Sequence, residues 1–135
     1  MILELSPRGP DGSTAAHDAP TAPSGTPSRV GDATIETHAD RVEIRLPRMA
    51  TTQLFHRWDG GSLRVSTDLR ELGDRTSAPD PRALYSLLQF GAPPHPITAF
   101  RDVGRCIAGH DTTIDVATGR VTSRPIARPP AAVDL

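Results

Sequence analysis

A six-residue segment in the first half of the chain alternates strictly between charged and apolar side chains. Within Arg41–Leu46, arginine and glutamate take the odd positions, and the even positions are apolar: Val42, Ile44 and Leu46. Successive side chains of a β-strand point to opposite faces, so this period of two predicts a strand with one buried face. The remaining segments must therefore complete an antiparallel sheet that has an apolar side.

Three further segments carry strand signals and are joined by short turns. The additional predicted strands are Ala33–His38, Gln53–Trp58 and Ser62–Thr67. His38–Arg41 offers the first turn, and Asp59–Gly61 is a strong hairpin signal because glycine accepts the positive φ that such turns need. Together these segments predict a four-stranded antiparallel meander.

The pattern changes from strand to helix after residue 67. Asp68–Leu72 predicts a single helical turn that ends at Gly73. A longer helix should begin at Asp80, a carboxylate at the N-cap that is followed by Pro81, and end at Gly91. Its apolar stripe comprises Leu84, Leu87 and Leu88. We expect this helix to cover the sheet.

A second hairpin is predicted near the end of the chain. Thr112–Val116 and Arg120–Arg124 are its strands, and Thr118–Gly119 is its turn. With the meander and the short helices, this hairpin predicts an α+β fold that spans residues 30–124. We expect residues 1–29 to form a disordered arm rich in Pro, Gly, Ser and Thr, with Met1–Leu5 frayed, and residues 125–135 to form a Pro/Ala-rich tail.

The core available to such a fold is small. Glycine (11) and proline (14) are abundant among the 135 residues, and aromatic residues make up only 4%. One meander under one helix would leave an apolar sheet face and open edges. We therefore expect this surface to be covered by a partner, by self-association or by the tail.

Composition excludes several classes of partner and compartment. The 15 basic and 16 acidic residues nearly cancel and form no polybasic block, which disfavours nucleic acid or an anionic membrane as the partner. The single Cys106 cannot form an internal disulfide. The chain has neither a signal-peptide pattern nor an apolar run long enough to span a bilayer, so a cytoplasmic protein is expected.

No catalytic motif stands out in the sequence. Neither a phosphate-binding glycine loop nor a GxSxG elbow occurs, and the five histidines lack the HxH and HExxH spacings. Cys106 has arginines nearby that could lower its thiol pKa, but we interpret it as a small buried apolar residue. His110–Asp111 is interpreted as a polar loop before a strand rather than as a metal site.

Two other groupings of polar residues have simpler explanations than catalysis. His38 and His56 could face each other across neighbouring strands, which would indicate packing or surface placement. The acidic residues that follow the meander are interpreted as a solvated helix face: Asp68, Glu71 and Asp74.

An ordered series of short segments resembles the later part of the N-terminal glutaminase-type domain of asparagine-synthetase-like proteins. The resemblance spans about residues 42–124. Its segments are Leu46–Ala50, Gln53–Phe55, Gly61–Leu72, Asp80–Leu84, Gln89–Gly91, Pro96–Val103, Arg105–His110 and Ile114–Val121. No single segment is specific, but the order of the series agrees with the family. The resemblance implies part of an N-terminal-nucleophile (Ntn) domain of type 2 glutamine amidotransferases.

The residues needed for glutamine hydrolysis are missing from this pattern. Members that hydrolyse glutamine use a cysteine directly after the initiator methionine, and Ile2 stands there in this chain. The ATP-pyrophosphatase motif Ser-Gly-Gly-x-Asp-Ser is also absent. We carry over no catalytic, cofactor-binding or metal-binding residue, and we expect no cofactor. The resemblance extends to relatives that lack the nucleophile, β-lactam synthetases and lasso-peptide cyclases among them.

These observations leave several functional readings open. The first is a pseudoenzyme, an accessory subunit that docks onto a synthetase or cyclase in the biosynthesis of an antibiotic, a RiPP or another specialised metabolite. The second is a small module that binds a peptide or a protein at an open β-edge, for which Arg41–Leu46 and Leu63–Thr67 are the candidate strands. A truncated remnant without function and a small enzyme with an unseen site are the others.

Overall fold

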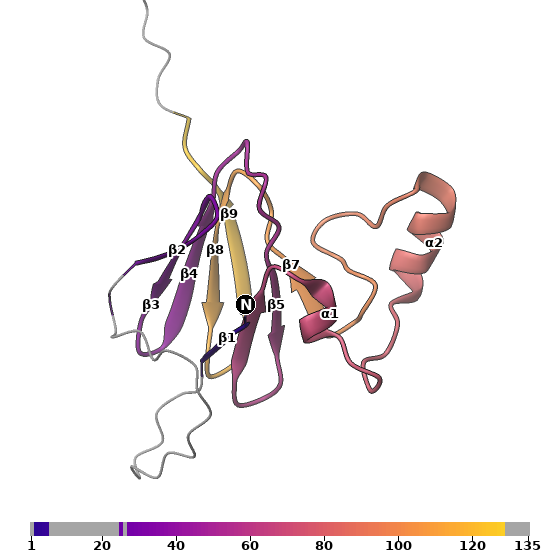
Figure 1. Cartoon of the computed structure of the whole chain (residues 1–135), viewed down its shortest axis with the longest axis horizontal. Coiled ribbons are helices and arrows are strands. Elements are labelled where there is room, and N and C mark those ends of the chain that lie inside the picture. Colours follow the sequence, from indigo (N-terminus) through magenta and orange to yellow (C-terminus); the bar gives the residue numbers. More distant parts are fainter. Residues whose placement is uncertain (1, 6–24, 26, 129–135) are drawn as a thin grey trace, which may run out of the picture.

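The computed structural model describes residues 2–5, 25 and 27–128 (Figure 1). Two antiparallel sheets make up most of this part of the chain, and two short helices follow one another in the sequence between β6 and β7, two strands of the same sheet. The α+β fold class predicted from the sequence is confirmed. No described helix has both the length and the apolar character needed to cross a membrane.

The larger sheet has five strands. Its spatial order is β2 (Ser28–Val30), β3 (Ala33–Thr37), β4 (Arg41–Leu46), β8 (His110–Asp115) and β9 (Val121–Pro125). Two of the three predicted turns lie here, because the turn at His38–Arg41 joins β3 to β4 and the turn at Thr118–Gly119 joins β8 to β9. The pairing of β4 with β8 joins the two hairpins into one sheet.

The smaller sheet has four strands. Its order is β1 (Ile2–Leu5), β6 (Leu63–Ser66), β5 (Phe55–Trp58) and β7 (Val103–Arg105). The hairpin turn predicted at Asp59–Gly61 connects β5 to β6. Each strand of this sheet is antiparallel to its neighbours.

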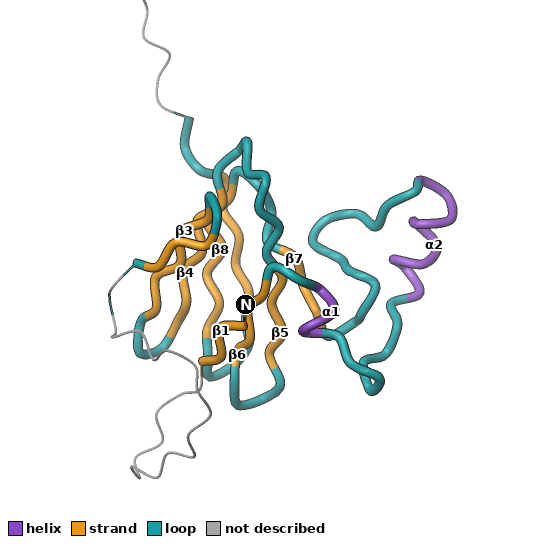
Figure 2. Tube along the Cα trace, in the orientation of Figure 1, coloured by secondary structure: helices purple, strands orange, loops and turns teal. Residues whose placement is uncertain are grey.

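The two sheets lie face to face around one core, with the larger sheet on the left of Figure 2. The alternating residues of β4 supply the larger sheet's share of this core, and Leu63 and Val65 of β6 supply that of the smaller sheet. Trp58 links the layers directly, because its indole Nε1 donates a hydrogen bond to the carbonyl of Val116 at 2.8 Å. Each sheet therefore covers the apolar face of the other.

The prediction of one continuous meander is wrong in its second half. Between β4 and β5 the chain leaves the larger sheet and enters the smaller one. Asp32 holds this crossing segment, since its carboxylate accepts the backbone N–H groups of Thr51 at 2.7 Å and Thr52 at 3.1 Å. A hydrogen bond with the side chain of Thr52, together with these backbone hydrogen bonds, holds the pKa of Asp32 down to about 2.

The first helix, α1 (Leu69–Leu72), covers the outer face of the smaller sheet. The predicted single turn that ends at Gly73 is confirmed, and Asp68 caps it by accepting the N–H of Arg70. Leu72 is completely buried and packs in a small cluster with Phe55 and Val103. This cluster is separate from the core between the sheets.

The second helix, α2 (Pro81–Phe90), has the predicted ends but not the predicted position. Asp80 caps it and Gly91 ends it in the left-handed conformation with φ 78°. It projects from the sandwich at the right of Figure 1 instead of covering a sheet. Its base is fastened by the N–H of Asp80, which donates to the carbonyl of Ala99 at 2.9 Å.

The chain termini differ from expectation at β1, at β2 and at Pro125, which ends β9 instead of beginning the tail. Met1–Leu5 was expected to fray, but Ile2–Leu5 forms β1 and pairs with β6. Ser28 and Arg29, assigned to the disordered arm, belong to β2. The arm at residues 6–24 and 26 and the tail at 129–135 lie outside the described residues.

Candidate binding surfaces

Cys106 has the properties of a core residue. Its side chain is 3% exposed and belongs to the cluster between the sheets. Burial raises the pKa of its thiol to about 12, so the thiolate needed for nucleophilic attack does not form near neutral pH. The interpretation as a buried apolar residue is therefore confirmed.

His38 and His56 do not face each other. His56 lies on β5, between Val65 and Gly104 in the register of the smaller sheet, whereas His38 follows β3 in the larger sheet. Burial lowers the pKa of His56 to about 4, so its imidazole is neutral at pH 7. The two histidines do not pair across neighbouring strands, because the β3–β4 hairpin belongs to the larger sheet and the β5–β6 hairpin to the smaller one.

His38 instead belongs to an acidic group that the sequence analysis missed. Its Nε2 lies 3.8 Å from carboxylate oxygens of both Glu36 and Glu43, which are cross-strand partners on β3 and β4. The imidazole of His38 and the two carboxylates each offer one ligand atom, and these atoms lie within 4.8 Å of one another, which is close enough to hold a metal cation. However, Arg41 already donates to Glu43 at 2.7 Å, which makes this an ion-paired surface cluster. The predicted hairpin of Ala33–His38 with Arg41–Leu46 contained the signal, because a turn at His38–Arg41 brings Glu36 opposite Glu43.

His110–Asp111 does not form a paired site either. The two residues are neighbours on β8, so their side chains lie on opposite faces. Asp111 accepts two hydrogen bonds from the guanidinium of Arg45, at 2.7 and 2.9 Å. The ring of His110 contacts the carbonyl of Ala108 through Nδ1 at 3.1 Å.

The acidic residues after β6 maintain local structure. Asp68 caps α1, and Glu71 accepts a hydrogen bond from the hydroxyl of Ser66. Asp74 accepts hydrogen bonds from the residues of the next turn and from Arg57, which hold the pKa of Asp74 down to about 2. The interpretation as a solvated helix face applies to Glu71 alone, because Asp68 is the N-cap and Asp74 lies beyond the end of α1.

The largest exposed apolar surface of the described residues lies on α2. We call it the α2 surface; its residues are Leu84, Tyr85, Leu87, Leu88 and Phe90. Leu88 is 88% exposed and Phe90 is 73% exposed, while Ala83 is the only buried residue of the helix. The predicted stripe is correct in spacing, but it faces solvent and not a sheet.

A second feature is a cleft where the two sheets separate near β5, β7 and β9. It encloses about 330 Å³, and His56, Trp58, Ile97, Gly104, Gly119 and Val121 are among its lining residues. Two of them must be glycine because an aromatic ring lies against each. A Cβ on Gly104 would overlap the ring of His56, and a Cβ on Gly119 would overlap that of Trp58.

The sheet edges are not where the sequence analysis placed them. The two candidate edge strands, Arg41–Leu46 and Leu63–Thr67, became β4 and β6, which have neighbours on both sides. The edges are β2 and β9 in the larger sheet and β1 and β7 in the smaller one. All five residues of β9 are exposed.

A broad hollow of about 560 Å³ lies beyond the end of β9. Arg45, Arg48 and Arg128 line it together with Ile126. The guanidinium of Arg45 is paired with Asp111, so Arg48 and Arg128 carry the positive charge of this hollow.

Comparison with known proteins adds no relative to these observations. No protein-family model matches the sequence, and a search of curated proteins likewise finds no match.

Proposed function

We propose that this chain is a non-catalytic accessory subunit that docks onto an ATP-dependent enzyme forming amide or peptide bonds. The α2 surface carries the proposal. A helix that projects from the body with its leucines, tyrosine and phenylalanine in water has the form of an anchor for another protein.

The chemistry of the described residues supports a role without catalysis. Ile2 takes the position at which the resembling family carries its nucleophile, and its backbone is paired with Ser66 in β1 and β6. The only thiol, Cys106, is buried with a raised pKa. A glutaminase mechanism needs a thiolate with its own α-amino group as the base, and neither condition is met at these positions.

The size of the α2 surface suits a protein partner. Its five side chains present on the order of 600 Å², against about 800 Å² per partner in a standard interface. The helix carries one charged residue, Arg82, whose guanidinium is paired with Asp80 at 2.8 Å. Docking α2 in a groove would therefore bury large apolar side chains without leaving an unpaired charge behind.

The class of partner comes from the sequence resemblance. In β-lactam synthetases and lasso-peptide cyclases, a domain of this kind accompanies an adenylating domain. We propose that this chain does the same as a separate subunit, in the biosynthesis of a specialised metabolite or RiPP. Its contribution would be to stabilise and orient the adenylating enzyme.

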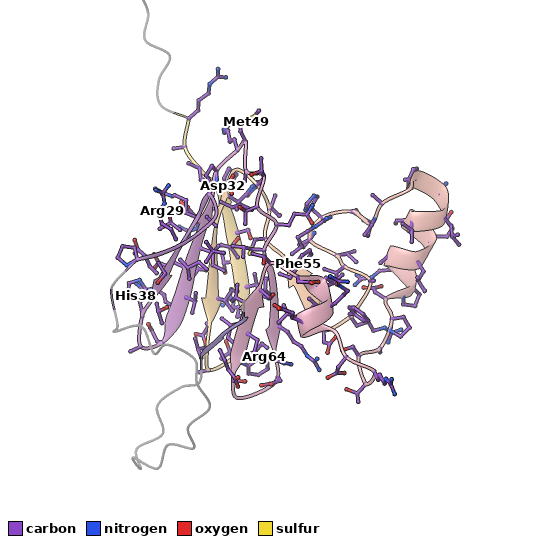
Figure 3. All side chains as sticks on the ribbon, in the orientation of Figure 1. Arg29, Asp32, His38, Met49, Phe55 and Arg64 are labelled. Atoms are coloured by element: carbon purple, nitrogen blue, oxygen red, sulfur yellow. The ribbon has the colours of Figure 1, made fainter. Side chains whose placement is uncertain are left out.

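Co-expression with a synthetase or cyclase encoded beside its gene tests the proposal. We expect one complex on gel filtration and a higher rate of AMP and pyrophosphate release than the enzyme gives alone. The double variant Leu84→Ser, Leu88→Ser should lose both. Met49→Ser is the matched control, because Met49 is 90% exposed but lies on a loop away from α2 (Figure 3).

Two results would contradict the proposal. The first is full synthetase activity without this chain and no complex between them. The second is a complex that the α2 double variant leaves intact. A homodimer that the same variant dissociates would assign the α2 surface to self-association instead.

A further inference from the structure

We infer that the free edge of β9 and the adjoining cleft bind an extended peptide in which carboxylate and apolar side chains alternate. The site is separate from the α2 surface and requires no synthetase, so it goes beyond the accessory role. The peptide would add a sixth strand to the larger sheet.

The backbone of β9 is ready for such pairing. Asp115 donates to the carbonyl of Arg120, and Ile126 donates to the carbonyl of Gly109, which fixes the hydrogen-bonding register at both ends of the strand. In an antiparallel ladder the intervening residues alternate, so Val121 and Ser123 direct their N–H and C=O groups away from β8. These groups form an open row along the outer edge.

The other sheet edges are shorter or partly covered. β2 and β7 have three residues each, and Ile97 bridges to Gly104 on the open side of β7. β9 has five residues, all exposed, and its only proline is the last one, Pro125. Folded proteins usually protect a long exposed edge with charges pointing inward, proline, bulges or a covering segment. The arginine and the proline of β9 lie at its end, at Arg124 and Pro125, and no described segment covers residues 121–123. These three residues therefore offer an edge that can acquire a partner strand.

The cleft gives an added strand an apolar side. The side chains of Val121 and Ser123 lie on the same face of the sheet as the buried Ile114 and Thr112 opposite them. An added strand would therefore direct every second side chain toward the cleft beside Val121. The cleft lining combines the neutral ring of His56 with Trp58 and Ile97, which offer apolar contacts to an added strand, and it also includes four charged residues: Asp80, Arg82, Arg101 and Asp102.

The charges around β9 specify the other side chains of the peptide. Arg120 directly precedes β9, and Arg124 lies within it. The strand contains no acidic residue. The cross-strand neighbour of Arg124 is Asp111, whose carboxylate is already bound by Arg45. No described residue forms an ion pair with Arg124. Carboxylates on the outward positions of an added strand would meet these arginines, because side chains directly opposite on neighbouring strands interact.

The same charges disfavour a second copy of this chain as the added strand. An antiparallel β9–β9 pair centred on Thr122 would place Arg120 of each chain opposite Arg124 of the other. Like charges directly opposite on adjacent strands are destabilising. An acidic peptide has the complementary charge, and we commit to it as the occupant.

Fluorescence anisotropy with a labelled peptide of alternating glutamate and valine tests the inference on the full chain. We expect saturable binding that is at least tenfold tighter than that of a matched peptide of alternating lysine and valine. Ser123→Pro should abolish binding because it removes an edge N–H, whereas Ser123→Ala, which keeps the N–H, should not. Both variants lose the contact between Ser123 Oγ and Thr112 Oγ1 equally.

A second pair of variants covers the case in which Ser123→Pro fails to fold. Arg124→Glu leaves the backbone unchanged and should weaken the glutamate peptide about tenfold while improving the lysine peptide. Arg29→Glu, on the opposite edge of the same sheet, is its matched control and should change neither affinity.

The inference is overturned if the glutamate peptide does not bind, or if Arg124→Glu leaves its affinity unchanged. A dimer that Ser123→Pro dissociates would overturn it in favour of self-pairing. The double variant Leu84→Ser, Leu88→Ser should retain full peptide affinity. The two proposals can therefore fail separately. Loss of docking through the α2 surface would leave peptide binding at β9 intact, and loss of peptide binding would leave docking intact.

Discussion

The imidazole of His56 occupies the space that a Cβ on Gly104 would need. The two residues are cross-strand neighbours on β5 and β7, at the wall of the cleft between the sheets. Burial lowers the pKa of His56 to about 4. A glycine on one strand thus makes room for the imidazole ring of a histidine on the next.

The first prediction concerns the pH dependence of stability. His56 has a pKa near 6.5 when unfolded and about 4 when folded, so the unfolded chain binds the proton more tightly. Its contribution to stability is complete above about pH 6.5 and is lost as the pH falls toward 4. We expect the free energy of unfolding to drop by about 2 kcal/mol between pH 7.5 and pH 5. Urea titrations at the two pH values measure this difference.

His56→Leu is the variant that isolates this contribution. It keeps an apolar side chain against Gly104 but has no proton to bind, so most of the loss between the two pH values should disappear. Carboxylates such as Asp32 and Asp74, whose pKa values are lowered to about 2, act at lower pH and do not enter this range. An unchanged pH dependence in the variant would show that His56 is not the responsible group.

The second prediction concerns Gly104 itself. Gly104→Ala should destabilise the fold by about 1–3 kcal/mol, because the new methyl group overlaps the ring of His56. The cost should shrink in a His56→Ala background, as a double-mutant cycle would measure. Gly61→Ala is the control, because a Cβ there meets nothing within 4 Å. Equal costs in both backgrounds would mean that the ring is not the obstacle.

The third prediction concerns Arg57, which ties the smaller sheet to the segment after α1. Its guanidinium donates to the carbonyl of Leu72 at 2.7 Å and pairs with Asp102 at 2.9 Å, and its side chain is 13% exposed. Arg57→Met should lower the free energy of unfolding by about 2 kcal/mol, because these acceptors lose their partner. Arg45→Met removes a solvent-exposed pair and should have little effect. Similar losses in the two variants would contradict this ranking.

The fourth prediction concerns the thiol of Cys106. Because it is buried and its pKa is raised to about 12, iodoacetamide should not modify the folded chain near pH 8. Modification should follow unfolding in urea at the rate of a free cysteine. Rapid labelling of the folded chain, measured by mass spectrometry, would mean that the thiol is accessible and would reopen the search for a nucleophile.

Local signals in the sequence predicted the elements whose causes are local. Asp80 and Gly91 marked the ends of α2 correctly, because a cap acts on the backbone within one turn. The turn at Thr118–Gly119 predicted the second hairpin for the same reason. None of these signals depends on what lies elsewhere in the fold.

The errors concern contacts between distant parts of the chain. Period-two alternation shows that β4 and β6 each have a buried face, but it does not say which sheet each joins. The strand β1 was missed because its partner β6 lies far along the chain. The binding surfaces follow from these same contacts. Only the position of α2 reveals that its stripe faces solvent, and only the sheet order makes β9 an edge.

The last prediction compares two leucines whose surroundings are opposite. Leu72 of α1 is completely buried, whereas Leu88 of α2 is 88% exposed. Leu72→Ala should cost about 3 kcal/mol by leaving a cavity against Phe55 and Val103. Leu88→Ala should change the free energy of unfolding of the isolated chain by no more than about 0.5 kcal/mol. A large cost at Leu88, measured by urea unfolding, would mean that α2 packs on the sandwich in solution, and the α2 surface would then not be free to dock.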